Sequence, residues 1–172
     1  MFQSRMTLVT AALAAMLPCM AVAQGLKPNQ PPKDFCPLGQ KIGLPTGRVS
    51  EDGCSSAPYV ASPTPGRNGL NNTLAFYSLS EPGKETELLY ISLMLNVNNP
   101  AEAEIANKML VTAAEGLAGQ VLGKVPPGLV EATRKSRNGT WKSGGWNVEV
   151  NRKEWNTSSG GHQVTVRFRA AN

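Results

Sequence analysis

Residues 87–97 alternate between two sets of side chains, and this pattern constrains the fold more than any other feature of the chain. One set is apolar throughout: Leu89, Ile91, Leu93, Leu95 and Val97. The intervening set is mostly polar or amphipathic: Tyr90, Ser92, Met94 and Asn96. Alternation with a period of two is typical of a strand that buries one face of a sheet and leaves the other in water. We therefore expect a sheet with one covered face and one open face.

Shorter segments of the same kind predict four more strands. They are bounded by residues that favour turns, such as the Pro82-Gly83 and Gly144-Gly145 pairs. The predicted strands are residues 73–79, 140–143, 146–152 and 162–169. In the last two, one face is apolar and the other polar, so both strands are expected to be half buried.

A long helix is predicted between the second and third strands. Asn99 can cap its start, Pro100 suits the first helical position, and Glu102 can reach back to the cap. Gly123 can end the helix after Leu122 in a left-handed conformation. The expected buried stripe is Ile105, Met109, Leu110, Ala113, Leu117 and Val121. A short second helix is predicted over residues 129–136.

The order of these elements predicts an α+β fold. Two strands, a long helix, a short helix and three strands fit an antiparallel sheet of about five strands, packed on one face by the two helices. We expect residues 71–172 to form this single domain.

Residues 24–70 differ from the rest of the chain in composition. Eight prolines and seven glycines exclude long helices and central strands from this segment. We interpret it as an irregular arm whose first part, residues 24–35, is a mobile tail. Cys36 and Cys54 are expected to form a disulfide that ties the arm down, worth about 3 kcal/mol. A metal site is the weaker alternative, because the Cys spacing fits no zinc pattern and no His is near.

The first 23 residues have the order of parts of a secretory signal peptide. Arg5 precedes an uncharged apolar run, and the small residues Ala21-Val22-Ala23 predict cleavage before Gln24. A retained membrane anchor remains open, since the run approaches the ~17 residues that a spanning helix needs. Lipid attachment at Cys19 is the other alternative. Pro18 argues against the anchor, and the missing small residue before Cys19 argues against the lipid.

The leader therefore predicts a periplasmic or secreted protein, and its Ala-rich composition is typical of bacteria. After cleavage we expect no stable membrane insertion, because no later segment of the sequence is long and apolar enough to span a bilayer.

Candidate catalytic groups are scarce. His162 is the single His, and Asp34 and Asp52 are the only Asp residues, which is thin material for a hydrolase triad. His162 shares the phase of Val164 and Val166, so we interpret it as a strand residue at the rim of the core. Two Glu residues could in principle cleave a glycosidic bond, but no Glu lies in a recognisable setting. Phosphate loops, dinucleotide fingerprints and metal-ligand clusters are absent from the sequence, so we predict no catalytic residue, metal or cofactor.

Positive charge is concentrated near the C-terminus. From Arg134 onward, eight Lys and Arg residues face only Glu149 and Glu154. Of the 17 Lys and Arg residues, only Arg5 lies in the leader, so the mature chain would carry a net charge of 16 − 12 = +4. Such a field favours acidic proteins, acidic polysaccharides or lipid headgroups, and export argues against nucleic acid. A solvated basic face without a partner remains an open alternative.

The three Trp residues lie among these basic side chains. Aromatic and cationic side chains together are typical of contact surfaces. Trp141 and Trp146 are expected to fill the space between sheet and helix, whereas Trp155 lies in or beside a loop. The predicted binding residues are Trp155, Arg152, Lys153, Arg167 and Arg169.

Together these features predict an exported, non-enzymatic protein that binds another envelope or secreted protein. An inhibitor, or an immunity protein against an envelope-targeted toxin, would fit. One alternative is an accessory component of an envelope assembly that docks through the Pro-rich arm. The other is a polysaccharide-directed protein, either a binder of acidic glycans or a Glu-based hydrolase.

Overall fold

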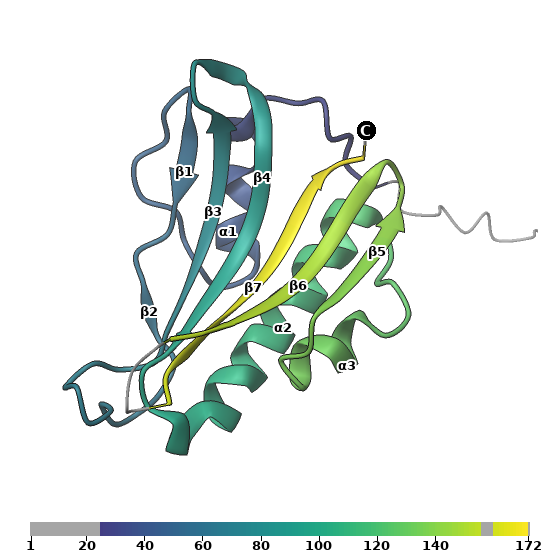
Figure 1. Ribbon diagram of the computed structural model, residues 1–172. Helices are drawn as coiled ribbons and strands as arrows, with labels where there is room; N and C mark the ends of the chain where they lie inside the picture. Colours follow the sequence, from purple (N-terminus) through teal and green to yellow (C-terminus); the bar gives the residue numbers. More distant parts are fainter. Residues whose placement is uncertain (1–24, 156–159, 172) are drawn as a thin grey trace, which may run out of the picture.

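The computed structural model describes residues 25–155 and 160–171, so the predicted leader lies outside the described residues. The α+β architecture is confirmed, with helices on one face of a seven-stranded antiparallel sheet (Figure 1). The strand order is β1-β3-β4-β7-β6-β5, and β2 also pairs with β3.

All five predicted strands are present, and the arm adds two short ones. The strands are β1 (Gly53–Ser55), β2 (Tyr59–Val60), β3 (Thr73–Glu81), β4 (Lys84–Val97), β5 (Gly139–Ser143), β6 (Trp146–Glu154) and β7 (His162–Ala170). The helices are η1 (Pro32–Phe35), α1 (Cys36–Lys41), η2 (Pro100–Glu102), α2 (Ala103–Leu122) and α3 (Leu129–Arg134). Both predicted helices are therefore found, as α2 with η2 and as α3.

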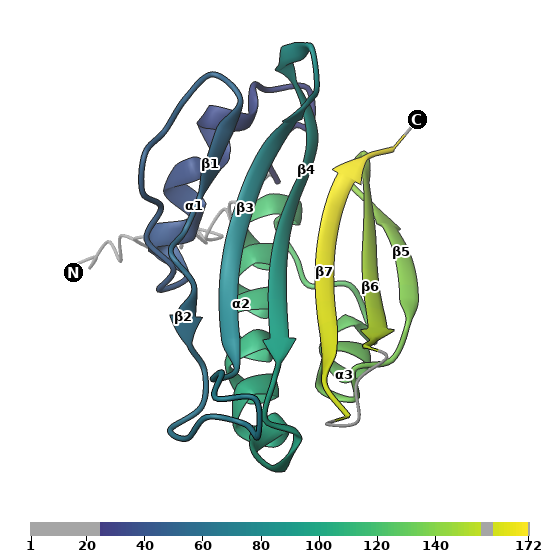
Figure 2. The same ribbon diagram turned by 60° about the vertical axis from the view of Figure 1, so that its left-hand side comes forward.

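The alternation along β4 decides which face of the sheet is covered. Ile91, Leu93, Leu95 and Val97 are fully buried. They pair with β7, whose Val164, Val166 and Phe168 are buried in the same layer. Figures 1 and 2 show α1, α2 and α3 on this side of the sheet, and none of the helices of the described residues on the other.

The buried stripe of α2 is rotated from the predicted one. Ile105 was expected in the core, but it is 47% exposed, so this prediction is wrong. The helix instead turns Ala106, Ala114 and Ala118 inward, alongside Leu110 and four other apolar residues of α2. Small side chains let the helix axis approach the sheet closely, which a wide Ile at the contact would prevent.

The start of the helix is capped as predicted, except at Glu102. The Asn99 side chain accepts a hydrogen bond from the Ala101 N–H, and Gly123 ends α2 with φ 73°. Glu102, however, does not reach back to the cap. Its carboxylate accepts hydrogen bonds from the Thr64 hydroxyl (2.6 Å) and N–H (3.1 Å), so it ties the arm to the helix instead. These bonds favour the ionised form and lower the pKa of Glu102.

The predicted disulfide is confirmed. Cys36 at the start of α1 is bonded to Cys54 in β1, with Cα atoms 5.9 Å apart. Both residues are buried. The bond therefore fastens α1 to β1 within the arm, and β1 pairs with β3 at the edge of the sheet.

The predicted mobile tail is wrong from Gly25 onward. The Leu26 N–H donates to the Val121 carbonyl at 2.8 Å, and Phe35 is fully buried. The Phe35 ring meets the Trp146 ring edge to face at 5.8 Å. These apolar side chains cover part of the sheet that α2 and α3 leave open, and their burial outweighs the entropy of ordering the segment.

Within residues 25–155 and 160–171, no helix combines the length and apolar character that crossing a membrane requires.

Candidate functional site

The open face of the sheet is polar along β6 and β7. Since successive side chains of a strand point to opposite faces, the residues between the buried apolar positions face away from the helices. These outward residues are Asn147, Glu149, Asn151 and Lys153 on β6, opposite Arg169, Arg167, Thr165 and Gln163 on β7. Lys142 of β5 extends this face beyond Asn147.

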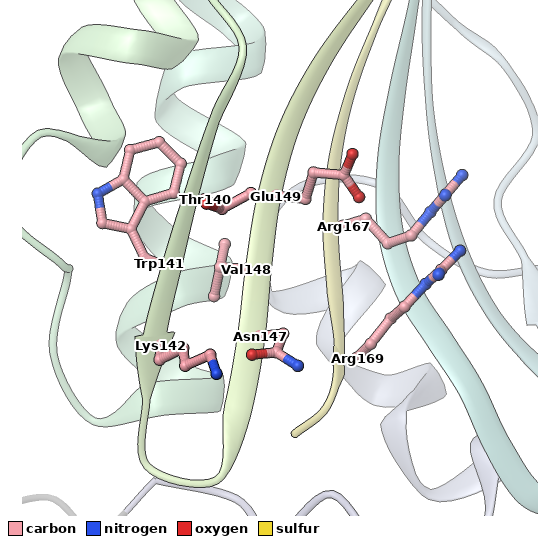
Figure 3. Close-up of a pocket in the computed structure, with 8 residues that line it drawn as sticks. All are labelled: Thr140, Trp141, Lys142, Asn147, Val148, Glu149, Arg167 and Arg169. Carbon is pink, nitrogen blue, oxygen red and sulfur yellow. The ribbon is translucent and has the colours of Figure 1, made fainter. Parts of the chain in front are cut away.

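Two arginines of this face share one aromatic ring on β4. The Arg167 Cζ lies 4.7 Å from the Tyr90 ring centroid, and the Arg169 Cζ lies 5.9 Å from it. Both distances are within the range of cation–π attraction. Figure 3 shows the two side chains extending side by side, away from β6.

This cluster lies where the sheet divides. The pairing of β4 with β7 ends at Ile91 and Phe168. Beyond that point β4 continues with β3 toward Lys84, whereas β7 continues with β6 toward Ala170. Figure 2 shows the two strands diverging. Tyr90 is the first β4 residue past the last pair, so its ring is available to side chains that arrive from β7.

The cations of the open face have no acidic partners in the part of the chain that the structure describes. Glu149 stands opposite Arg167 in the strand register, yet no ion pair within 4.0 Å involves Arg167, Arg169, Lys142 or Lys153 there. The seven ion pairs found among the described residues join other side chains. The open face is therefore left with uncompensated positive charge.

One polar atom of the arginine cluster is also buried without a partner. The Arg167 Nε has no hydrogen-bond partner among the described residues, and neither has the Oγ of Ser92, which lies opposite Arg167 on β4. The Nε atom of Arg167 is thus held away from water, and the side chain extends toward β4 (Figure 3).

Two adjoining hollows mark this surface. One, of about 390 Å³, lies between Lys142 of β5 and the two arginines of β7, with Asn147 and Glu149 between them (Figure 3). The other, of about 240 Å³, is lined by six residues: Glu149, Asn151, Lys153, Gln163, Thr165 and Arg167. Because Glu149 and Arg167 line both, the hollows form one polar depression across β5, β6 and β7.

The structure brings together only part of the predicted binding set. Arg167 and Arg169 lie together, and Lys153 lies on the same face. Arg152 alternates with Lys153 and therefore points to the other side of β6. Its Nε donates a hydrogen bond to the Glu154 carboxylate at 2.5 Å. Trp155 follows the end of β6, where it is half buried and its backbone N–H donates to the Gly161 carbonyl.

The sequence interpretation did not identify Tyr90, Asn147 or Lys142 as part of the site. The alternation of residues 87–97 already placed Tyr90 on the open face. Its contact with two arginines of β7 depends on a pairing between strands that are far apart in sequence, and no local pattern shows such a contact.

The remaining candidate residues lie in the core or pack against it. Trp146 is fully buried and Trp141 packs against the core, as expected. The Trp141 Nε1 donates to the Pro127 carbonyl at 2.9 Å. His162 is buried at the start of β7, in phase with Val164. Burial lowers the pKa of His162, and the charge of Arg152 lowers it further.

Among the described residues, no group of three or more His, Cys, Asp or Glu side chains is placed to hold a metal ion. Comparison with protein-family models, curated proteins and solved structures gave no match to this chain. The geometry of the open face is therefore the basis for the functional proposal.

Proposed function

We propose that this protein is exported and acts by binding a partner protein of the bacterial envelope or the secreted fraction, without catalysing a reaction. An inhibitor or an immunity protein would act in this way. The observation that carries the proposal is the basic open face: Lys142, Lys153, Arg167 and Arg169 have no acidic partner within 4.0 Å among the described residues.

Export is supported by the disulfide as well as by the predicted leader. Disulfides persist in oxidising compartments and are rare in the cytosol. The Cys36–Cys54 bond is buried and joins two elements of the fold, as a structural disulfide does. Together, the predicted leader and the disulfide support our proposal that the mature protein lies in the periplasm or outside the cell.

A binding role fits the charge distribution of the sheet. The covered face supplies the core, so side chains on the other face are free to serve a partner. Uncompensated cations steer an acidic partner toward this face and raise its rate of association. The buried His162 shares the phase of Val164 and Val166 on the covered face of the sheet, so it does not face the depression.

An acidic polysaccharide is the second candidate, because the depression is lined by amide side chains as well as by cations. Asn147, Asn151 and Gln163 can hydrogen-bond sugar hydroxyls, while the cations attract the acidic groups. A Glu-based hydrolase has less support. Glycoside cleavage uses a pair of carboxylates, and Glu149 is the one carboxylate among the residues lining the two hollows.

The test is affinity capture with the mature chain, residues 24–172, from the envelope and culture-medium fractions of its source, read by mass spectrometry. The test variant replaces the four open-face cations: Lys142→Gln, Lys153→Gln, Arg167→Gln and Arg169→Gln. The matched control makes the same charge change at exposed cations elsewhere: Lys41→Gln, Arg48→Gln, Lys124→Gln and Arg137→Gln.

We expect a protein partner that the wild type and the control capture in stoichiometric amounts and the open-face variant does not. Capture of no partner, or equal capture by both variants, would contradict the proposal. Recovery of an acidic glycan in place of a protein would favour the second candidate.

A further inference from the structure

We propose that Arg167, Arg169 and Tyr90 form a clamp for one side-chain carboxylate, an Asp or Glu in an exposed acidic segment of the partner protein. This inference rests on the proposed function and specifies the chemistry of its site. It is carried by the two guanidinium groups that share the Tyr90 ring at the point where β4 and β7 separate.

The clamp carries more positive charge than its surroundings compensate. Two guanidinium groups lie within 6 Å of one ring centroid, and no carboxylate of the described residues is paired with either. The ring quadrupole attracts each cation but cannot neutralise it. An anion placed between the two guanidinium groups would relieve their mutual repulsion, which makes this position the strongest candidate for an anion on the face.

The arrangement also reduces the entropy that binding would cost. Arg167 is half buried, its Nε is shielded from water, and its end groups are held over Tyr90. A long side chain that is already ordered loses less rotamer freedom when a ligand arrives. The Arg167 half of the clamp is thus preorganised, unlike the exposed Lys153 on the same face.

Glu149 restricts where an anion can bind. It stands opposite Arg167 on the β6 side, whereas both arginines extend toward β4 (Figure 3). A carboxylate that approached between β6 and β7 would meet this negative charge, and repulsion of that kind contributes to specificity. The favourable position is therefore on the β4 side, against the guanidinium groups.

The geometry favours a protein carboxylate over a sugar. Sugars commonly stack on the face of an aromatic ring, but the Arg167 guanidinium lies over the Tyr90 ring. The site instead presents planar guanidinium groups. Their N–H donors match the two oxygens of a carboxylate in a bidentate arrangement. Tyr and Arg are also the residues enriched at the energetic centre of protein interfaces.

The test is a titration of the full mature chain with three probes, in which two-dimensional NMR and calorimetry measure binding. The probes are a blocked oligoglutamate peptide, a blocked oligoglutamine peptide of equal length, and an oligogalacturonate. We expect oligoglutamate to bind, to shift the signals of Tyr90 and the end of β7, and to bind more tightly than the other two.

The variants separate a clamp from a general attraction to positive charge. Arg167→Lys and Arg169→Lys keep the charge but lose the planar fork, so each should weaken oligoglutamate binding by about tenfold. Lys153→Gln removes a charge from the same face and should weaken it by less than about threefold. Thermal melting checks that each variant is folded. If Arg167→Lys does not fold, the exposed Arg169 decides the question alone.

Three results would overturn the clamp: unchanged affinity in both Lys variants, an equal loss in Lys153→Gln, or tighter arginine-dependent binding of oligogalacturonate. The outcome is distinguishable from that of the proposed function. A partner protein lost by the four-cation variant but retained by the two Arg→Lys variants would refute the clamp and leave the binding function standing. Binding of oligoglutamate by the clamp without any captured partner protein would contradict the proposed function and leave the clamp standing.

Discussion

Trp146 and Leu26 are joined by a hydrogen bond although they are 120 positions apart in the chain. The indole Nε1 donates to the Leu26 carbonyl at 2.8 Å, and the fully buried ring also meets Phe35 edge to face. One side chain of the C-terminal strands thus holds the first described residues of the chain against the core.

Replacement of Trp146 by Phe should therefore destabilise the whole fold. The change removes the bond to Leu26 and leaves a cavity beside Phe35, so we expect the free energy of unfolding to fall by roughly 2 to 4 kcal/mol. Urea denaturation measures the loss. Tyr59→Phe, at a half-exposed ring, is the control and should change stability by less than about 0.5 kcal/mol. Equal stability of both variants would contradict the structural role of Trp146.

Loss of the disulfide should cost about 3 kcal/mol. Cys36 and Cys54 are 18 positions apart, and the cross-link restricts the unfolded chain by about that amount in the chain-entropy account. We expect the Cys36→Ala, Cys54→Ala double variant to have a lower urea midpoint than the oxidised wild type. Reductant should lower the midpoint of the wild type and leave that of the double variant unchanged. A wild type insensitive to reductant under denaturing conditions would argue against the bond.

Asn72 should be the most sensitive polar residue at the helix start. Its buried amide donates to the Asn99 carbonyl at 3.0 Å and accepts from the Asn99 N–H at 2.7 Å. Asn72→Ala leaves both backbone groups without these partners, so we expect a loss of about 2 kcal/mol in the free energy of unfolding. The exposed Asn151→Ala serves as the matched control and should change stability little. A neutral effect of Asn72→Ala would show that water replaces the amide.

His162 should make the fold less stable in mild acid. Burial lowers its pKa below the ordinary value of about 6.5, and the charge of Arg152 adds to this, while Glu154 acts in the opposite direction. The unfolded chain therefore binds a proton at a higher pH than the folded chain. The stabilisation is complete above about pH 6.5 and is lost as the pH falls below it, toward the lowered folded pKa.

Urea midpoints between about pH 7.5 and 5.5 test this expectation, because most carboxylates titrate at lower pH. His162→Gln should flatten the curve in that range. A variant whose stability falls as steeply as that of the wild type would assign the pH dependence to other groups.

The arginines of the open face should contribute little to stability. Neither Arg167 nor Arg169 has an ion pair among the described residues, and a cation–π contact at an exposed site is worth about 0.5 to 1 kcal/mol. We expect Arg167→Gln and Arg169→Gln each to change the free energy of unfolding by about 1 kcal/mol or less, while binding is lost. A large loss of stability in either variant would point to a structural role instead.

Much of the secondary structure follows from local pattern. The alternation of residues 87–97 identified the longest strand and its buried face, because a period of two puts Ile91, Leu93 and Leu95 on one side. Asn99 and Gly123 marked the ends of the helical segment, since caps act through bonds and angles within a few residues. The stripe of α2 was harder to predict, because Ile105 and Ala106 are both apolar and only the approach of the sheet selects between them.

The candidate site was less accessible from the sequence. Alternation placed Arg167 and Arg169 on a polar strand face, and the concentration of charge placed Lys153 among basic residues. They did not separate Arg152, whose partner Glu154 is two positions away on the same side of the strand. The contact between Tyr90 and Arg167 joins residues 77 positions apart, so it depends on the order in which the strands pair.

By itself, the sequence determined the α+β elements, the face of each main strand that turns to the core, and the pairing of the two Cys residues that follow the predicted leader. These features arise from the period of hydrophobic residues and from capping chemistry, which act over short stretches. Only the tertiary structure decided that the arm packs into the core through Leu26 and Phe35, and that two arginines share Tyr90 where the sheet divides. Both features depend on contacts between segments that are distant in the sequence, and such contacts form only when the chain folds.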